Sequence, residues 1–117
     1  MKGVYILIIR LKKDRVIKVG NLGRIFFKEG IYFYVGRSLR GMEARIRRHL
    51  SKRKKLFWHI DYFLNSRDAK IIGIIKIKTQ DKSLECQISR YFSKYFHPIS
   101  YFGSSDCHCV SHFFFAG

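Results

Sequence analysis

The chain has 117 residues, which is the size of one domain that can bury its own hydrophobic core without disulfide bonds. An apolar content of 47% excludes a disordered chain. Lys and Arg number 24 against 8 Asp and Glu, and the resulting net charge of +16 makes nucleic acid the expected partner.

The N-terminal third of the chain is predicted to form strands. Residues 3–11 are rich in Ile, Leu, Val and Tyr, and shorter strand-like segments follow at 16–19, 24–28 and 31–35. The connections between them are too short for crossovers, so we expect a run of antiparallel hairpins.

Helical spacing begins after Gly36. Apolar residues at 42, 46 and 50 predict a helix that carries Arg45 and His49 on a face beside its apolar stripe. A short helix is predicted at 57–64, a buried strand at 71–77, an amphipathic helix from Leu84 to Tyr95, and a last strand at 113–115. The expected fold class is α+β, with one domain over residues 1–117 and a small antiparallel sheet flanked by helices.

The segment from Arg37 to Lys55 is dense in Lys and Arg and contains one acidic residue, Glu43. This density favours a phosphate-facing surface, although a solvated helix face or a solubility device would have the same composition. The candidate nucleic-acid contacts in this part of the chain are Arg37, Arg40, Arg48, Lys52, Arg53, Lys54 and Lys55.

Acids are scarce, which narrows the choice of a metal ligand. Most of them fall in predicted turns, loops or caps, whereas Asp61 and Glu85 lie beside apolar residues inside predicted helices. One carboxylate is enough for Mg²⁺, because this ion keeps several waters and takes phosphate oxygens from its substrate. The alternative for Glu85 is a surface position near a helix N-terminus.

The cysteines and histidines raise the question of a second metal. Cys107, Cys109 and His112 form a candidate structural zinc site, and the alternative is a compact turn without metal. Cys86 is interpreted as a buried thiol. A tetrahedral site would need a fourth ligand, and the candidates considered for it are His59, Asp61 and His108.

The expected location is the cytoplasm. The longest apolar stretch, residues 4–9, is far short of a bilayer span, and Arg10 and Lys12 follow too soon for a signal peptide. Disulfides are therefore not expected among the three cysteines. Neither a membrane nor a small-molecule cofactor is expected as a partner.

The ordered set of motifs resembles the GIY-YIG nuclease family. Gly3-Val4-Tyr5 and Tyr34-Val35-Gly36 are similar to its two named motifs. Arg45 with His49 is similar to the arginine and histidine of its first helix, and Glu85 to its metal-binding glutamate. The resemblance covers nearly the whole chain and implies a GIY-YIG-like domain.

Two further segments resemble the Uri-type subgroup of small endonucleases. They are Trp58-His59-Ile60-Asp61-Tyr62 and Ser105-Asp106-Cys107-His108-Cys109, the latter with His112. A literal Gly30-Ile31-Tyr32 also precedes the second motif, but the family arrangement needs its two motifs on neighbouring strands. Gly3-Val4-Tyr5 is therefore taken as the first motif, Tyr32 as a packing residue, and residues 12–29 as an inserted hairpin.

The resemblance implies an endonuclease that hydrolyses phosphodiester bonds with one Mg²⁺ or Mn²⁺, acting on DNA in repair or recombination. Tyr5 or Tyr34 would orient or deprotonate the attacking water. Arg45 would stabilise charge on the scissile phosphate, assisted by His49, and Glu85 would hold the metal. The alternatives are a nucleic-acid-binding module without activity and a partner domain of a DNA repair enzyme.

Overall fold

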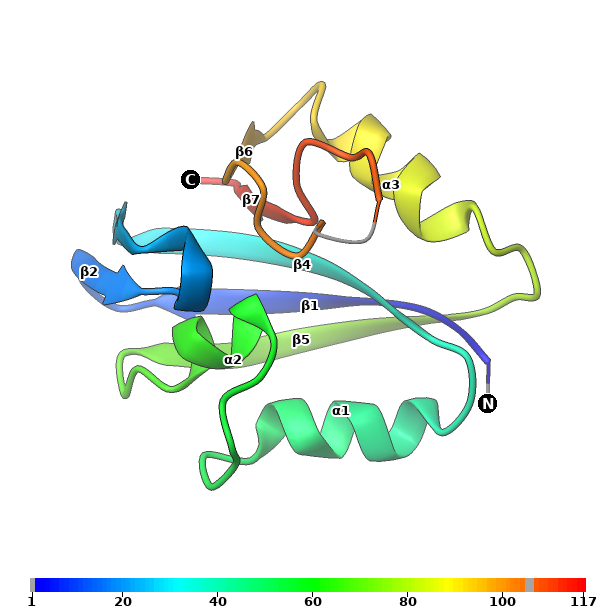
Figure 1. Ribbon diagram of the computed structural model, residues 1–117, viewed down its shortest axis with the longest axis horizontal. Coiled ribbons are helices and arrows are strands. Elements are labelled where there is room, and N and C mark those ends of the chain that lie inside the picture. Colours follow the sequence, from blue (N-terminus) through cyan, green and yellow to red (C-terminus); the bar gives the residue numbers. More distant parts are fainter. Residues whose placement is uncertain (1, 105–106) are drawn as a thin grey trace.

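The computed structural model describes residues 2–104 and 107–117, so Ser105 and Asp106 of the Uri-type segment lie outside the described residues. Five strands form an antiparallel sheet in the order β5-β1-β4-β7-β6 (Figure 1). The predicted α+β class is therefore confirmed. The strands of this sheet, in that order, are Ala69–Lys78, Gly3–Leu11, Gly30–Ser38, Phe113–Phe115 and His97–Pro98.

In the described part of the chain, three α-helices accompany the sheet, α1 (Met42–Leu50), α2 (His59–Leu64) and α3 (Leu84–Phe92), and a short 3-10 helix spans Gly20–Leu22. Within the described residues, none of them has the length and apolar character needed to cross a membrane.

The long strands β1 and β4 form the centre of the sheet. Their register places Tyr5 opposite Gly36 and Leu7 opposite Tyr34, so the two tyrosines lie on neighbouring strands. Between them, β2 (Arg15–Lys18) pairs with β3 (Arg24–Phe27) in a separate two-stranded sheet, which confirms the inserted hairpin. The expected run of hairpins is wrong in two respects, because β1 pairs with β4 rather than with β2, and β3 does not pair with β4. Only a strand as long as β4 can satisfy the backbone groups of β1 along its whole length.

Alternate side chains of β1 build two apolar layers. Tyr5 and Leu7 pack with residues of α1 and α2, whereas Val4 and Ile6 pack with residues of α3. The sheet is thus covered by α1 and α2 on one face and by α3 on the other (Figure 1). This explains why β1 is a continuous apolar run rather than an alternating one.

Aromatic rings fill the layer between the sheet and α2. Tyr32 is 1% exposed, stacks on Phe113 with ring centroids 5.1 Å apart, and donates its hydroxyl to the carbonyl oxygen of Lys28 at 2.6 Å. This confirms Tyr32 as a packing residue. Phe27 of β3 packs edge-on against Phe63 of α2, which anchors the inserted hairpin to the same core.

Candidate functional site

A cavity of about 620 Å³ lies where the helices of both sheet faces come together. Its lining includes Tyr5 of β1, Tyr34 and Arg37 of β4, Arg45 of α1 and Glu85 of α3. The pairing of β4 with β7 ends at Tyr34, and beyond that point side chains from helices on opposite faces can meet. The expected convergence of these distant residues is therefore present in the fold.

Among the described residues that line the pocket, Glu85 supplies the carboxylate and the other charged groups are basic. Its Oε1 lies 4.0 Å from Nε of Arg37, its Oε2 lies 3.6 Å from Nδ1 of His112, and its side chain is 19% exposed. Arg40 and Arg45 add two more positive charges to the lining. The pocket thus combines one acidic group with three guanidinium groups, an arrangement suited to an anionic ligand and a cation together.

Arg45 is held in place before any ligand arrives. Its Nη1 donates to the carbonyl oxygen of Arg37 at 2.9 Å, and its guanidinium lies 4.6 Å from the centroid of the Trp58 ring. A guanidinium has five N–H donors in a fixed geometry, so one backbone hydrogen bond orients the group and leaves donors for a phosphate in the pocket.

Arg48, one turn further along α1, has a different environment. It forms two hydrogen bonds of 2.8 Å with the carboxylate of Asp61, which is fully buried. Asp61 also accepts the backbone N–H groups of Phe57 and Trp58 at 2.9 and 2.8 Å. Burial would raise the pKa of Asp61, but these hydrogen bonds outweigh it and lower the pKa. Arg48 and Asp61 therefore fasten the start of α2 to α1.

Two predicted lysine contacts also bind backbone oxygens. Lys52 donates to the carbonyl oxygens of Leu64, Ser66 and Ala69 at 2.6–3.1 Å. Lys54 donates to the last carbonyl oxygens of α1 at 2.9 and 3.1 Å. Arg53 and Lys55 are exposed on the following loop. Of the predicted nucleic-acid contacts, the structure places Arg37 and Arg40 at the pocket.

His49 lies behind Tyr5, and both side chains are buried. Nε2 of His49 is 2.7 Å from the hydroxyl oxygen of Tyr5, and the ring of Tyr34 lies 6.0 Å from the imidazole. Burial raises the pKa of Tyr5 and Tyr34 far above the ordinary value, and for Tyr5 the charge of Arg45 opposes this only in part. Burial and the charge of Lys54 lower the pKa of His49 to about 4. All three groups are neutral at pH 7.

The proton on the His49 ring follows from its surroundings. Nδ1 is buried and has no hydrogen-bond partner among the residues that the structure describes. A buried N–H without an acceptor is rarer than a buried acceptor without a donor, so we assign the proton to Nε2. Nε2 then donates to Tyr5, whose own hydroxyl proton is directed elsewhere. Because Tyr5 lines the pocket, that proton is available to a ligand there.

The rim of the pocket holds residues that were not among the predicted contacts. Phe57 is 76% exposed, and Trp58 and Leu39 line the same cavity. An exposed ring beside a basic pocket is a platform on which a base can stack. The signal was present in the sequence, since Phe57 and Trp58 follow one residue after the basic run that ends at Lys55.

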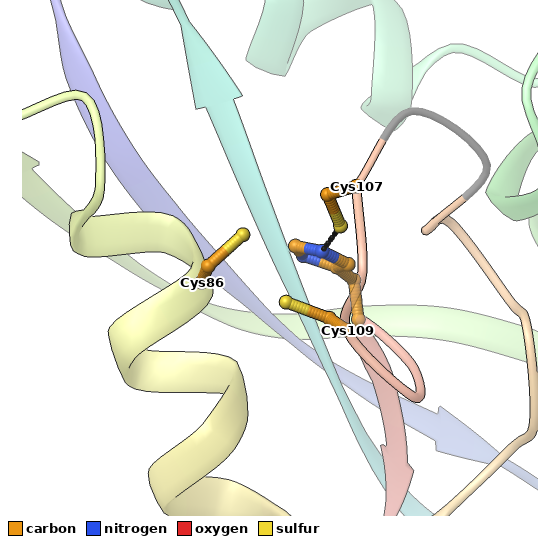
Figure 2. A group of neighbouring side chains, drawn as sticks. Cys86, Cys107 and Cys109 are labelled. Carbon is orange, nitrogen blue, oxygen red and sulfur yellow. Dashed lines mark hydrogen bonds between the residues drawn. The ribbon is translucent and has the colours of Figure 1, made fainter.

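A second polar group lies beside the pocket. Cys86 of α3 points toward Cys107 and Cys109 of the C-terminal loop (Figure 2), and together with His112 their ligand atoms lie within 4.8 Å of one another. This group could bind a metal ion. The interpretation of Cys86 as a buried thiol is corrected, because Cys86 is only partly buried and belongs to this group. The three cysteines are free.

The expected fourth ligands are also corrected, because the group contains Cys86 and none of these three residues. His59 accepts the backbone N–H of Gly103 at 2.8 Å, Asp61 pairs with Arg48, and His108 is exposed. The sequence did contain the signal for Cys86, since its three cysteines and His112 together make a complete tetrahedral ligand set.

His112 connects the thiol group with the pocket. It is 1% exposed, and its Nε2 lies 3.1 Å from Sγ of Cys107. Its Nδ1 lies 3.1 Å from the hydroxyl oxygen of Ser89 and 3.6 Å from the carboxylate of Glu85. One ring nitrogen therefore faces the thiols and the other faces the acidic wall of the pocket.

The family model that matches this chain describes a domain of unknown function, DUF123, and the match covers residues 4–117. The chain therefore belongs to the DUF123 family. No curated protein and no solved structure matches it.

This family match overturns the assignment to the GIY-YIG nucleases and their Uri-type subgroup, which is wrong. The two tripeptide motifs lie on β1 and β4, and aromatic and β-branched residues are common in any buried strand, so short motifs of this kind do not identify a family.

Proposed function

We propose that this protein is an endonuclease that hydrolyses phosphodiester bonds in nucleic acid, with DNA as the expected substrate and one Mg²⁺ or Mn²⁺ at Glu85. The supporting observation is the convergence of one carboxylate, three arginines and two tyrosines in a single cavity. The net charge of +16 supports a polyanionic substrate over a small neutral one.

The pocket fits a hard divalent ion. Glu85 presents a partly exposed carboxylate to a cavity of about 620 Å³, which has room for several waters and a phosphate group. Mg²⁺ and Mn²⁺ accept such a site, because waters and substrate oxygens complete their coordination. A bound ion of this type supplies an activated water and neutralises charge on the phosphate.

The side chains around Glu85 bind and orient the substrate. Arg45, oriented by Trp58 and the backbone of Arg37, is suited to hold two oxygens of one phosphate and to stabilise the charge that develops there. Tyr5 is a neutral hydrogen-bond donor backed by His49, so it orients a phosphate oxygen or a water. Its raised pKa argues against Tyr5 as the base that deprotonates the water.

The protonation states of the tyrosines and of His49 favour a second candidate function. Tyr5, Tyr34 and His49 are all neutral at pH 7, so the pocket lacks a protein group with a pKa near 7 among them. A nucleic-acid-binding module without hydrolysis, or a binding partner of a DNA repair enzyme, would keep the arginines and the stacking ring of Phe57.

The two functions are separated by a cleavage panel of duplex, branched and single-stranded DNA and RNA with Mg²⁺ or Mn²⁺. We expect cleavage by the wild type, and a loss of at least about 100-fold in Glu85→Gln. Glu43→Gln is the matched control, because Glu43 pairs with Lys76 on the surface and does not belong to the pocket lining. Salt-sensitive binding by a folded wild type without any cleavage would establish the binding module instead.

A further inference from the structure

The group formed by Cys86, Cys107, Cys109 and His112 has the ligand types and the ligand number of a structural metal site. Its four ligand atoms come from α3 and from the C-terminal loop and lie within 4.8 Å of one another. Tetrahedral zinc with Zn–S bonds of about 2.3 Å needs sulfur atoms about 3.8 Å apart, so a contraction of about 1 Å completes the site. Three sulfurs and one imidazole fill all four positions, which leaves none for a substrate.

We infer that Cys86, Cys107, Cys109 and His112 bind one Zn²⁺, which fastens the C-terminal loop to the first turn of α3. Soft thiolate ligands select zinc over the hard ions proposed for Glu85. None of these four residues takes part in the proposed hydrolysis, so this inference does not rest on the proposed function.

Proton balance and local charge are compatible with this site. Binding releases three thiol protons, so the loaded group of three thiolates, one neutral imidazole and Zn²⁺ carries one negative charge. Cys86 lies in the first turn of α3, where the helix dipole favours a thiolate. The strongly cationic chain around it also favours a site with net negative charge.

Zinc also determines the hydrogen bonding of His112. Nε2 faces Cys107 and becomes the metal ligand, so the ring proton must reside on Nδ1. Nδ1–H is then aimed at the hydroxyl oxygen of Ser89 and at the carboxylate of Glu85. A histidine that binds zinc through one ring nitrogen usually donates the N–H of the other to a carboxylate, a carbonyl oxygen or a water. The zinc site and the acidic wall of the pocket are thus joined through one imidazole.

The alternative for this group is a disulfide between two of the cysteines. Cys107 and Cys109 are separated by one residue, and Cys86 approaches from another element. A disulfide between any two of them would use only two of the four side chains that the fold brings together. Zinc uses all four groups at once, which favours it over a disulfide.

The test is the metal content of protein purified in reducing buffer, reconstituted with ZnCl₂ and dialysed against a weak chelator. We expect one zinc per chain in the wild type and less than one tenth of that in Cys86→Ser. His108→Gln is the matched control, because His108 is exposed between two proposed ligands, and it should keep its zinc. A wild type without stoichiometric zinc, or with iron in its place, would overturn the inference, as would a disulfide found by mass spectrometry.

Cys86→Ser could lose zinc merely because it fails to fold, so a second measurement uses the wild type. Replacement of zinc by Co²⁺ should give the intense visible bands of a tetrahedral ion and a near-ultraviolet thiolate charge-transfer band that scales with three sulfurs. Weak octahedral bands would contradict the inference. Neither measurement involves a nucleic acid, so failure of the nuclease proposal would leave both results unaffected.

Discussion

The two sides of the pocket use charge in opposite ways. On the α1–α2 side, Arg48 is paired with the fully buried Asp61, whose carboxylate is satisfied by four hydrogen bonds. On the α3 side, Glu85 stays partly exposed, 4.0 Å from Nε of Arg37, and faces the cavity. The position and partners of a charged residue, rather than its charge, therefore determine whether it is enclosed in the core, as Asp61 is, or lines the pocket, as Glu85 does.

Arg45 and Arg48 both lie on α1 against Trp58, but we expect Arg45 to contribute to cleavage and Arg48 to stability. Arg45→Gln should lower the cleavage rate by about 10²–10³-fold, because it removes a preorganised donor from the phosphate. Stability should change by less than about 1 kcal/mol, because one backbone hydrogen bond and one ring contact are lost. Single-turnover kinetics and urea unfolding measure the two effects.

Arg40→Gln is the control for Arg45, since Arg40 is exposed at the rim of the same pocket. It should lower cleavage by less than about 10-fold. Equal effects of the two substitutions would mean that the cavity is a general cationic surface rather than a catalytic site.

Asp61→Ala should reduce the free energy of unfolding by about 3 kcal/mol. The substitution removes the buried partner of Arg48 and leaves two backbone N–H groups at the start of α2 without an acceptor. The value is at the low end for a broken buried pair, because Arg48 is 29% exposed and can partly reach water. Urea unfolding at pH 7 would show this loss, and a change below about 1 kcal/mol would contradict the fastening role.

His49 makes the α1 side sensitive to acid. Its folded pKa of about 4 lies below the ordinary value, so the unfolded chain binds the proton more readily between about pH 4 and 6.5. The stability that the neutral imidazole contributes is complete above that window and is lost as the pH falls through it, by at most about 3 kcal/mol. Thermal unfolding of the wild type and His49→Gln across this range isolates the effect, which should be absent from the variant.

The smallest effect is expected at Glu43, which pairs with Lys76 at 3.0 Å on the surface. The side chains of Lys76 and Glu43 are 40% and 52% exposed, so Glu43→Gln should change the free energy of unfolding by less than about 1 kcal/mol, and less still at high salt. A larger loss would mean that an exposed pair on α1 stabilises the fold as a buried one does.

Much of the fold followed from local pattern. Apolar spacing predicted α1 and α3, and runs of β-branched and aromatic residues predicted β1, β4, β5 and β7, because side-chain pattern is a property of the local chain. The pairing of β1 with β4 could not be obtained in this way, since it depends on which strand satisfies the most backbone groups.

The candidate site was predictable only in part. Elimination among the acids left both Asp61 and Glu85, and only the family resemblance selected Glu85. The structure separates them by position, because Asp61 is buried against Arg48 whereas Glu85 lines the pocket. The short motifs on β1 and β4 pointed to a family that the whole-chain match does not support.

The amino-acid sequence by itself determined the cationic character, the helix and strand segments and the short list of reactive side chains. Only the tertiary structure decided which of these meet. Cys86 joins Cys107, Cys109 and His112 because α3 packs beside the C-terminal loop, and Glu85 reaches the pocket of Arg45 around the edge of the sheet. Contacts between residues far apart in the chain depend on packing and burial, which a linear pattern does not encode locally.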